Sequence, residues 1–357
     1  MTTMIQLRKT AGVAAVALGV LTPVMAMGPA AAAATWTVPR GTVEVGALPA
    51  PPAGPGPGKI AVWQPGSGAV REVSFAAPGT LEGSSFYVAA DQATHSLFVP
   101  TEAGKTTVLS TRSWRVTGSF ASPAGSRTAK TTPNGRLVLI ESGAKTVAYQ
   151  TRAPYRTVFT AAVGGNAIVI TPDGKRAFVG GNGDAVVTEL ALPSGHVIRT
   201  FPVGHSGDMA WAGGQVFSAD IANGVMSVIN PRSGRVTSIA TPEADPNFSY
   251  QNMAAATAGF MQLAVSPNQR TVYAAGFSGH ILKFSTTRDS YLGEVKVTAN
   301  PATPNKLSGL DILPGGRLAA VTVENLDTTV VVSLRTGKVV TATSGLASNR
   351  WVPLRSW

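Results

Sequence analysis

A short segment with one histidine and one aspartate is the best candidate for acid–base chemistry in this chain. His205 and Asp208 stand three residues apart in a Gly-His-Ser-Gly-Asp segment. An imidazole within reach of a carboxylate is held in one tautomer and can act as a general base. The same spacing is also typical of a turn in which the aspartate accepts hydrogen bonds from backbone amides. Both interpretations stay open at this point.

Other patterns for catalysis or metal binding are incomplete. Residues 204–208 and 276–280 both lack the last glycine of the G-x-S-x-G nucleophile motif. Residues 54–59, Gly-Pro-Gly-Pro-Gly-Lys, are shorter than a phosphate-binding loop and lack the Ser or Thr after the lysine. With four histidines and no cysteine, the chain offers few ligands to a transition metal. We therefore predict no cofactor, and only a Ca²⁺ ion held by clustered carboxylates is kept open.

The elements that would position these residues follow a repeat of about forty residues. The segment 132–139, Thr-Pro-Asn-Gly-Arg-Leu-Val-Leu, recurs at 171–179 as Thr-Pro-Asp-Gly-Lys-Arg-Ala-Phe-Val. Each repeat contains only short runs of β-branched or aromatic residues that end at Gly, Pro or Asn. A period of this size without helices is typical of a β-propeller, in which every repeat is one four-stranded blade.

We therefore predict an all-β fold, a seven-bladed β-propeller of four-stranded antiparallel blades. The six full repeats are expected at residues 86–123, 126–163, 166–203, 208–242, 261–297 and 308–345. Residues 60–73 supply only the two outer strands of a seventh blade. Its missing strands must come from residues 35–45 or 350–357, because the chain ends close the ring of sheets. The sequence leaves this choice open.

The repeats resemble the YVTN-repeat family of exported bacterial seven-bladed β-propellers. The resemblance covers residues 59–345 and rests on the second strand of each blade, such as Thr-Val-Tyr-Ala at 271–274, and on the Pro-Asp-Gly-Lys-Arg turn at 172–176. It implies the propeller fold. Its motif describes how a blade folds and names no site, and related propellers include binding proteins as well as lactonases, lyases and dehydrogenase subunits. The resemblance therefore implies no particular activity.

The fold sorts charge between two faces of the disc. Strand direction alternates within a blade, so the turn after the first strand and the turn after the third strand emerge on the same face. We call this the arginine-rich face, and its predicted basic residues are Arg112, Arg115, Arg136, Arg152, Arg156, Lys175, Arg176, Arg232, Arg235, Arg270, Arg288, Arg317, Arg335 and Lys338. The opposite face is predicted to be acidic, through Glu82, Glu102, Glu141, Asp184, Asp208, Asp220, Glu243, Asp245, Glu324 and Asp327.

The overall charge points to anionic partners. The chain has 29 basic and 18 acidic residues, a net charge of +11, and such a balance favours polyanions. We predict that envelope polymers or acidic lipids bind at Arg112, Arg115, Arg152 and Arg156. Nucleic acid is not expected, because basic and aromatic residues are not interleaved as in nucleic-acid-binding strands. A generally basic, soluble surface is the alternative.

The opposite face carries the predicted ligand site. Its residues are Asn166, His205, Asp208, His280 and Asp311, and they surround the expected mouth of the propeller. The connection over residues 241–259 is longer than the others, and long loops in compact domains are often functional. A small ligand or a partner protein is expected there.

The amino terminus has the layout of a secretory signal peptide. Arg8 and Lys9 precede an apolar run over residues 11–27 and an alanine-rich stretch that ends at Ala34. We therefore predict a cleaved signal over residues 1–34, an N-terminal segment with a Pro/Gly spacer over 35–58, and the propeller from residue 59 to residue 357. An uncleaved membrane anchor is the alternative.

Together these patterns predict an exported, non-catalytic binding or scaffold protein of the cell envelope. Its acidic mouth would hold a ligand or partner, and its arginine-rich face would contact polyanions. The alternative is a propeller enzyme of the lactonase or lyase type. In that case His205 would be the general base, with neighbouring carboxylates as orienting groups or metal ligands.

Overall fold

The computed structural model describes residues 37–39, 41–48, 58–75, 85, 87–181, 185–245, 247–248, 255–348 and 350–354. All of them belong to one compact unit, Thr37–Trp357. The predicted signal peptide, residues 49–57 of the spacer and part of the connection 241–259 lie outside the described residues.

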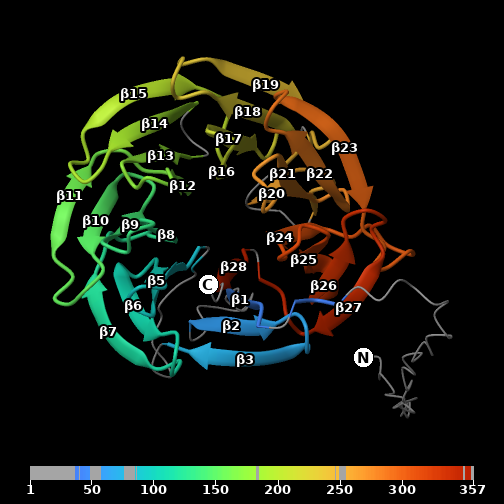
Figure 1. Cartoon of the computed structure of the whole chain (residues 1–357), viewed down its shortest axis with the longest axis horizontal. Helices are drawn as coiled ribbons and strands as arrows, with labels where there is room; N and C mark the ends of the chain where they lie inside the picture. Colours follow the sequence, from blue (N-terminus) through green and yellow to red (C-terminus); the bar gives the residue numbers. More distant parts are fainter. Residues whose placement is uncertain are drawn as a thin grey trace, which may run out of the picture. The chain divides into compact units, whose positions relative to one another are not determined.

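Seven four-stranded antiparallel sheets form a ring, which confirms the predicted seven-bladed all-β propeller (Figure 1). From the inside outward, blade 1 contains β28 (Val352–Leu354), β1 (Val43–Ala47), β2 (Lys59–Gln64) and β3 (Ala69–Ser74). Blade 2 contains β4 (Ala89–Asp91), β5 (Ser96–Thr101), β6 (Lys105–Ser110) and β7 (Val116–Ala121). Blade 3 contains β8 (Thr128–Thr131), β9 (Leu137–Glu141), β10 (Thr146–Gln150) and β11 (Thr157–Ala161).

The remaining four blades follow the same order along the chain. Blade 4 contains β12 (Ala167–Ile170), β13 (Arg176–Gly180), β14 (Val186–Ala191) and β15 (Val197–Pro202). Blade 5 contains β16 (Asp208–Ala212), β17 (Gln215–Asp220), β18 (Val225–Ile229) and β19 (Val236–Ala240). Blade 6 contains β20 (Phe260–Val265), β21 (Thr271–Gly276), β22 (His280–Ser285) and β23 (Ser290–Lys296). Blade 7 contains β24 (Leu307–Ile312), β25 (Leu318–Val323), β26 (Thr328–Ser333) and β27 (Val339–Ser344), with a short 3-10 helix η2 (Glu324–Leu326) before β26.

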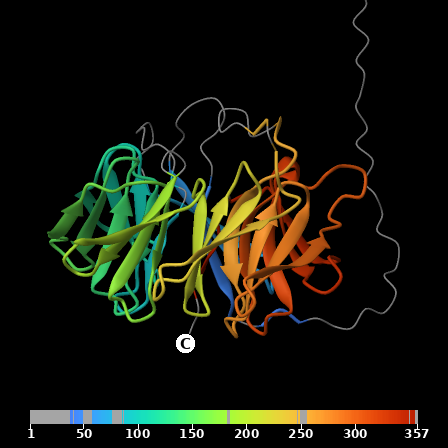
Figure 2. The same cartoon turned by 90° about the horizontal axis from the view of Figure 1, so that it is seen from above.

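The core lies between neighbouring blades. Every residue of β9 and β25, the second strands of blades 3 and 7, is buried, because these strands are covered by a blade on each side. The outermost strands β7 and β27 instead contain only exposed and partly buried residues. Viewed from the edge, the strands of each blade run between the two faces of the disc (Figure 2). This arrangement brings the start of each inner strand to one face and its end to the other.

The recurring turn motif works as a hydrogen-bonded cap between the first two strands of a blade. Thr132 Oγ1 donates to Asn134 Oδ1 at 2.8 Å and accepts from the backbone N–H of Leu137 at 3.1 Å. Thr171 with Asp173 and Ser266 with Asn268 repeat this geometry in blades 4 and 6. The repeat visible in the sequence is therefore a turn signal, as its Pro, Asn and Gly residues require.

Both candidate segments contribute to ring closure. Strand β28 is the innermost strand of blade 1 and pairs with β1, where Val45 lies opposite Val352. Strand β1 pairs on its other side with β2. The propeller therefore begins at Val43, and the prediction that it begins at residue 59 was wrong. The Pro/Gly spacer separates two paired strands of one blade, which a local composition signal cannot reveal.

The ring-closing strand is held by side chains from blades 1, 6 and 7. Gln262 Nε2 donates to the carbonyl oxygen of Trp351 at 2.8 Å, and Gln262 Oε1 accepts from the N–H groups of Trp351 and Leu310, both at 2.8 Å. The indole of Trp351 donates to Thr322 Oγ1 at 2.9 Å and lies 5.4 Å from the Trp63 ring. These contacts connect the last strand to the rest of the ring.

Candidate functional site

Four polar side chains from four blades meet at the centre of the ring. Asp208, the first residue of β16, accepts hydrogen bonds at Oδ2 from the Tyr87 hydroxyl and from the Leu263 N–H, both at 2.7 Å. Lys130 Nζ lies 4.2 Å from the centroid of the Tyr87 ring, and the Arg350 guanidinium carbon lies 5.3 Å from it. Blades 2 and 5 are not neighbours, so the bond between Tyr87 and Asp208 crosses the ring.

Burial controls the protonation of this group. Tyr87, Asp208 and Arg350 are only 4%, 3% and 6% exposed. Burial and then the charge of Asp208 raise the pKa of the Tyr87 phenol well above its ordinary value of 10.0. Burial lowers the pKa of Lys130, and the neighbouring Asp208 carboxylate opposes that shift. The phenol therefore stays a hydrogen-bond donor to Asp208.

The structure does not pair His205 with Asp208. The His205 side chain is exposed, and its backbone N–H donates to Asp220 Oδ2 at 3.2 Å. The Asp208 carboxylate is occupied by Tyr87 and by the backbone of Met209 and Leu263. The geometry matches the interpretation of a capping aspartate and gives His205 no orienting carboxylate among the described residues.

The other predicted ligand residues do not form one group. The carbonyl oxygen of Asn166 accepts from Thr128 Oγ1 at 3.1 Å. Asp208 begins its inner strand, whereas Asp311 is the last residue but one of the inner strand β24. The inner strands all run in the same direction, so Asp208 and Asp311 lie toward opposite faces of the disc. Only part of the predicted set lies at one mouth.

The long connection and His280 meet on blade 6. Ser278 Oγ lies 2.8 Å from His280 Nδ1, and His280 Nε2 lies 3.7 Å from Glu294 Oε1. Glu243, in the long connection, accepts hydrogen bonds from the Ser278 hydroxyl and from the Gly259 N–H. The sequence singled out His280 and the connection separately. It considered Ser278 only within an incomplete nucleophile motif and Glu243 only as part of the acidic face, because no sequence signal places a glutamate thirty-five residues away beside this serine.

Ser278, His280 and Glu294 resemble a serine–histidine–carboxylate series. The difference lies in the hydrogen of the serine hydroxyl, which points to another residue. A serine hydroxyl has one hydrogen, and here it is donated to Glu243. With the serine hydrogen directed at Glu243, His280 Nδ1 faces Ser278 Oγ as the donor in the tautomer that carries its hydrogen on Nδ1. Burial raises the pKa of Glu243. Hydrogen bonds from Ser278 and Gly259 lower this pKa and offset part of the shift. The arrangement therefore clamps the connection onto blade 6.

Most of the described carboxylates of the predicted acidic face are buried. Five of its carboxylates are at most 5% exposed: Glu141, Asp208, Asp220, Glu243 and Asp245. Most of them hold loops, as when Asp245 accepts from the N–H groups of Asn247 and Thr257, both at 2.9 Å. Glu82 and Asp184 lie outside the described residues. The prediction of an exposed acidic mouth was therefore wrong for the part of the chain that can be described.

Clustered metal ligands are not found either. No group of three or more His, Asp or Glu side chains suited to a metal ion occurs among the described residues. The Ca²⁺ site stays a prediction without geometric support.

The arginine-rich face does form. In five blades the turn after the third strand donates a backbone hydrogen bond to the turn after the first strand; the donor–acceptor pairs are Thr111–His95, Thr151–Arg136, Leu192–Lys175, Thr286–Arg270 and Leu334–Arg317. The predicted anion-binding residues Arg112, Arg115, Arg152 and Arg156 are all exposed. No carboxylate of a described residue pairs with them, whereas Arg176 on the same face pairs with Glu189 at 2.9 Å.

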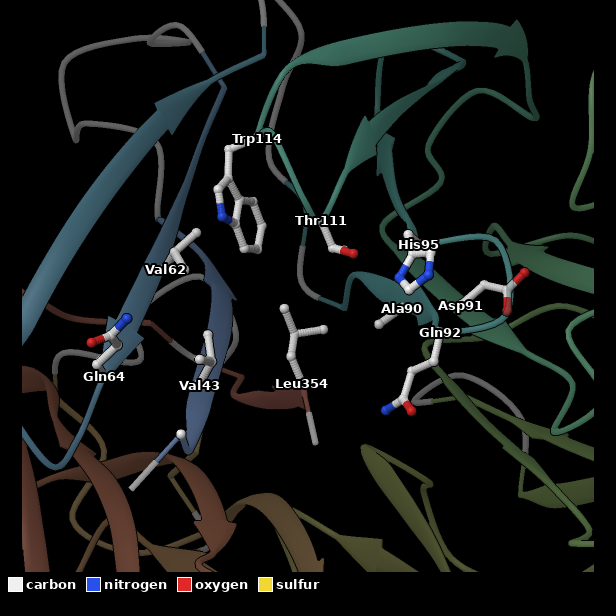
Figure 3. Close-up of a pocket in the computed structure, with 11 residues that line it drawn as sticks. Val43, Val62, Gln64, Ala90, Asp91, Gln92, His95, Thr111, Trp114 and Leu354 are labelled. Carbon is white, nitrogen blue, oxygen red and sulfur yellow. The ribbon is translucent and has the colours of Figure 1, made fainter. Parts of the chain in front are cut away.

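Two cavities lined by described residues open on this same face. One, of about 550 Å³, lies between blades 1 and 2, where the ring closes; we call it the seam cavity (Figure 3). Its lining residues are Gly41, Val43, Val62, Gln64, Ala90, Asp91, Gln92, His95, Thr111, Trp114 and Leu354. A second cavity of about 570 Å³ is lined by Ile170, Pro172, Trp211, Gly213, Gly214 and Gln269. Sequence reasoning did not find either cavity, because each is assembled from different blades.

Within the described residues, no helix is both long and apolar enough to span a bilayer.

Comparison with known proteins supports the fold alone. No protein-family model and no curated protein sequence matches the chain, so the resemblance to YVTN-repeat propellers stays a prediction. One similar solved structure is hydrazine synthase from Kuenenia stuttgartiensis, with a TM-score of 0.59 and 14% sequence identity. The match covers 71% of this chain and 78% of that chain. At this identity the likeness shows a common architecture and says nothing about activity.

Proposed function

We propose that this chain is an exported, non-catalytic binding protein that docks onto anionic envelope polymers or lipids through its arginine-rich face. The observation that carries this proposal is that Arg112, Arg115, Arg152 and Arg156 are exposed and pair with no carboxylate of a described residue. The buried carboxylates add support, because five of the eight described acidic residues predicted for the opposite face are buried.

The expected energies are sufficient for docking. A basic residue close to an anionic surface contributes about 1 kcal/mol, so three arginines contribute about 3 kcal/mol, or roughly 100-fold in affinity. Salt screens this attraction, because the Debye length falls as ionic strength rises. Binding through this face should therefore weaken steeply as salt is added.

A matched pair of triple variants tests the proposal. R115S/R152S/R156S removes three unpaired arginines of the arginine-rich face. R71S/K145S/K296S removes the same charge from exposed positions on β3, on the turn after β9 and at the end of β23. The assay is cosedimentation of the purified chain with phosphatidylcholine vesicles that do or do not contain phosphatidylglycerol.

The first variant should lose most of the binding to anionic vesicles, and the second should keep it. Equal losses in both would mean that only net charge matters, and the docking face would be refuted. Absence of binding to anionic vesicles and to polyphosphate would refute the polyanion function as a whole.

The enzyme alternative has less support in the geometry. A lactonase or lyase would need His205 as a base with an orienting carboxylate, and His205 has none among the described residues. The Ser278 hydroxyl donates to Glu243. Measurable hydrolysis of a lactone that is lost in the variant H205A would revive this alternative.

A further inference from the structure

The seam cavity has an unusual tryptophan at its wall. The turn after the third strand contains one residue with positive φ in every blade: Gly68, Trp114, Tyr155, Gly195, Gly234, Asp289 and Gly337. Glycine is favoured there because it has no Cβ to clash. Trp114 adopts φ 56° at this position, a conformation that is strained for a bulky residue.

Packing accounts for the tyrosine but only partly for the tryptophan. The Tyr155 ring stacks on Phe120 at a centroid distance of 5.0 Å and meets Phe98 edge-on at 6.4 Å. Trp114 touches the core between blades 1 and 2, yet its indole also forms a wall of the seam cavity (Figure 3). Strained residues that persist in a fold often mark binding sites.

The rest of the cavity combines apolar and planar polar groups. Val62 and Leu354 line it beside the indole. Gln64 and Gln92, both exposed, bring amide groups to it, and Thr111 brings a hydroxyl group. An indole face with amides and a hydroxyl nearby suits a pyranose ring, whose C–H face is apolar and whose edge carries hydroxyl groups.

The rim of the cavity is cationic. Arg112 Nη2 lies 2.6 Å from Nε2 of His95, which lines the cavity, and Arg115 follows Trp114 in the chain. The one carboxylate in the lining, Asp91, is buried and accepts hydrogen bonds from Ala93 N–H and Thr94 Oγ1 in its own turn. A negative substituent on the sugar would therefore meet Arg112 at the rim.

We propose that the seam cavity binds a sugar unit of an acidic polysaccharide, with the pyranose ring stacked on Trp114 and its carboxylate directed toward Arg112 and Arg115. This inference rests on the proposed function and names the class of polyanion. It requires that binding depend on the sugar as well as on the charge.

The test compares polygalacturonate with polyphosphate, a polyanion without sugar, as ligands of the purified chain. The principal variant is Trp114→Gly, because glycine occupies the same turn position in four other blades and should preserve the backbone. The matched control is Tyr155→Gly, the same change in blade 3 away from the cavity. The double variant Q64A/Q92A alters exposed residues only and covers the case in which Trp114→Gly fails to fold.

Trp114→Gly should weaken polygalacturonate binding about tenfold and leave polyphosphate binding unchanged. Q64A/Q92A should also weaken polygalacturonate binding, and Tyr155→Gly should leave polygalacturonate binding unchanged. The inference is overturned if Trp114→Gly and Q64A/Q92A both bind polygalacturonate like the parent. It is also overturned if the parent binds polyphosphate but not polygalacturonate, and that result would leave the proposed docking face intact.

Discussion

The Tyr87 hydroxyl donates a hydrogen bond of 2.7 Å to the carboxylate of Asp208 across the centre of the ring. Tyr87 directly precedes β4 of blade 2 and bridges to Thr128 of β8, whereas Asp208 begins β16 of blade 5, 121 positions along the chain. Lys130 and Arg350 lie close to the same phenol ring, so residues of blades 1, 2, 3 and 5 meet around one buried hydrogen bond. This contact ties non-adjacent blades together at the ring centre, around the mouth that sequence analysis expected to be acidic.

Tyr87→Phe should therefore destabilise the propeller. The variant keeps the ring but leaves the buried Asp208 with only its backbone donors, and a hydrogen bond to a charged group is worth about 2 kcal/mol. Urea denaturation followed by fluorescence measures the loss. Tyr149→Phe is the control, because Tyr149 is buried and no hydrogen bond to its hydroxyl is present among the described residues. Equal stabilities for the two variants would contradict the role of the Tyr87–Asp208 bond.

Glu141 should make stability depend on pH. Its carboxylate is 1% exposed and accepts no hydrogen bond from a described residue, and burial raises its pKa well above the ordinary value of 4.5. The folded state therefore holds a proton that the unfolded state has lost, so stability falls as pH rises from 4.5 through the folded-state pKa.

Glu141→Gln should remove this part of the dependence. Glutamine is neutral and nearly the same size, so the variant should gain stability relative to the parent as pH rises. Thermal unfolding of both proteins between about pH 5 and pH 8 measures the difference. A parent–variant difference that does not change with pH would show that Glu141 is ionised in the folded state.

Glu189 should give the opposite response to the same substitution. It is equally buried, but Arg176 and Arg199 donate to its two oxygens at 2.9 and 2.8 Å. Glu189→Gln removes the charge that both guanidinium groups face and should cost about 2 kcal/mol. Both arginines are partly exposed and can regain water, which keeps the cost below that of a fully buried pair. Urea denaturation at neutral pH provides the comparison with Glu141→Gln.

Gly276→Ala should release the long connection from blade 6. An added Cβ would collide with the Glu243 carboxylate, which would have to give up its bonds to Ser278 and Gly259. The connection should then be cleaved faster by a protease while the other blades stay resistant. Gly143→Ala is a suitable control, because a Cβ there meets no atom within 4 Å. Unchanged cleavage in Gly276→Ala would show that Glu243 is not what holds the connection.

Much of the fold could be predicted because its signals are local. The Thr-Pro-Asn-Gly and Thr-Pro-Asp-Gly turns mark the starts of β9 and β13, the second strands of their blades, within a few residues, since turn residues act on their own backbone. The candidate site was harder to predict. His205 and Asp208 are close in sequence, yet the Asp208 carboxylate turns toward Tyr87, because burial and a distant donor decide where a side chain points.

The sequence by itself determined the number of blades, the approximate strand positions and the gathering of arginines on one face, because periodicity and turn chemistry depend on neighbouring residues. Only the tertiary structure decided that β1 and β28 close the ring together, that the predicted acidic residues are largely buried, and that Trp114 faces a cavity between blades 1 and 2. These features depend on contacts between segments far apart in the chain. No local pattern specifies which distant group will cover or pair with a given side chain.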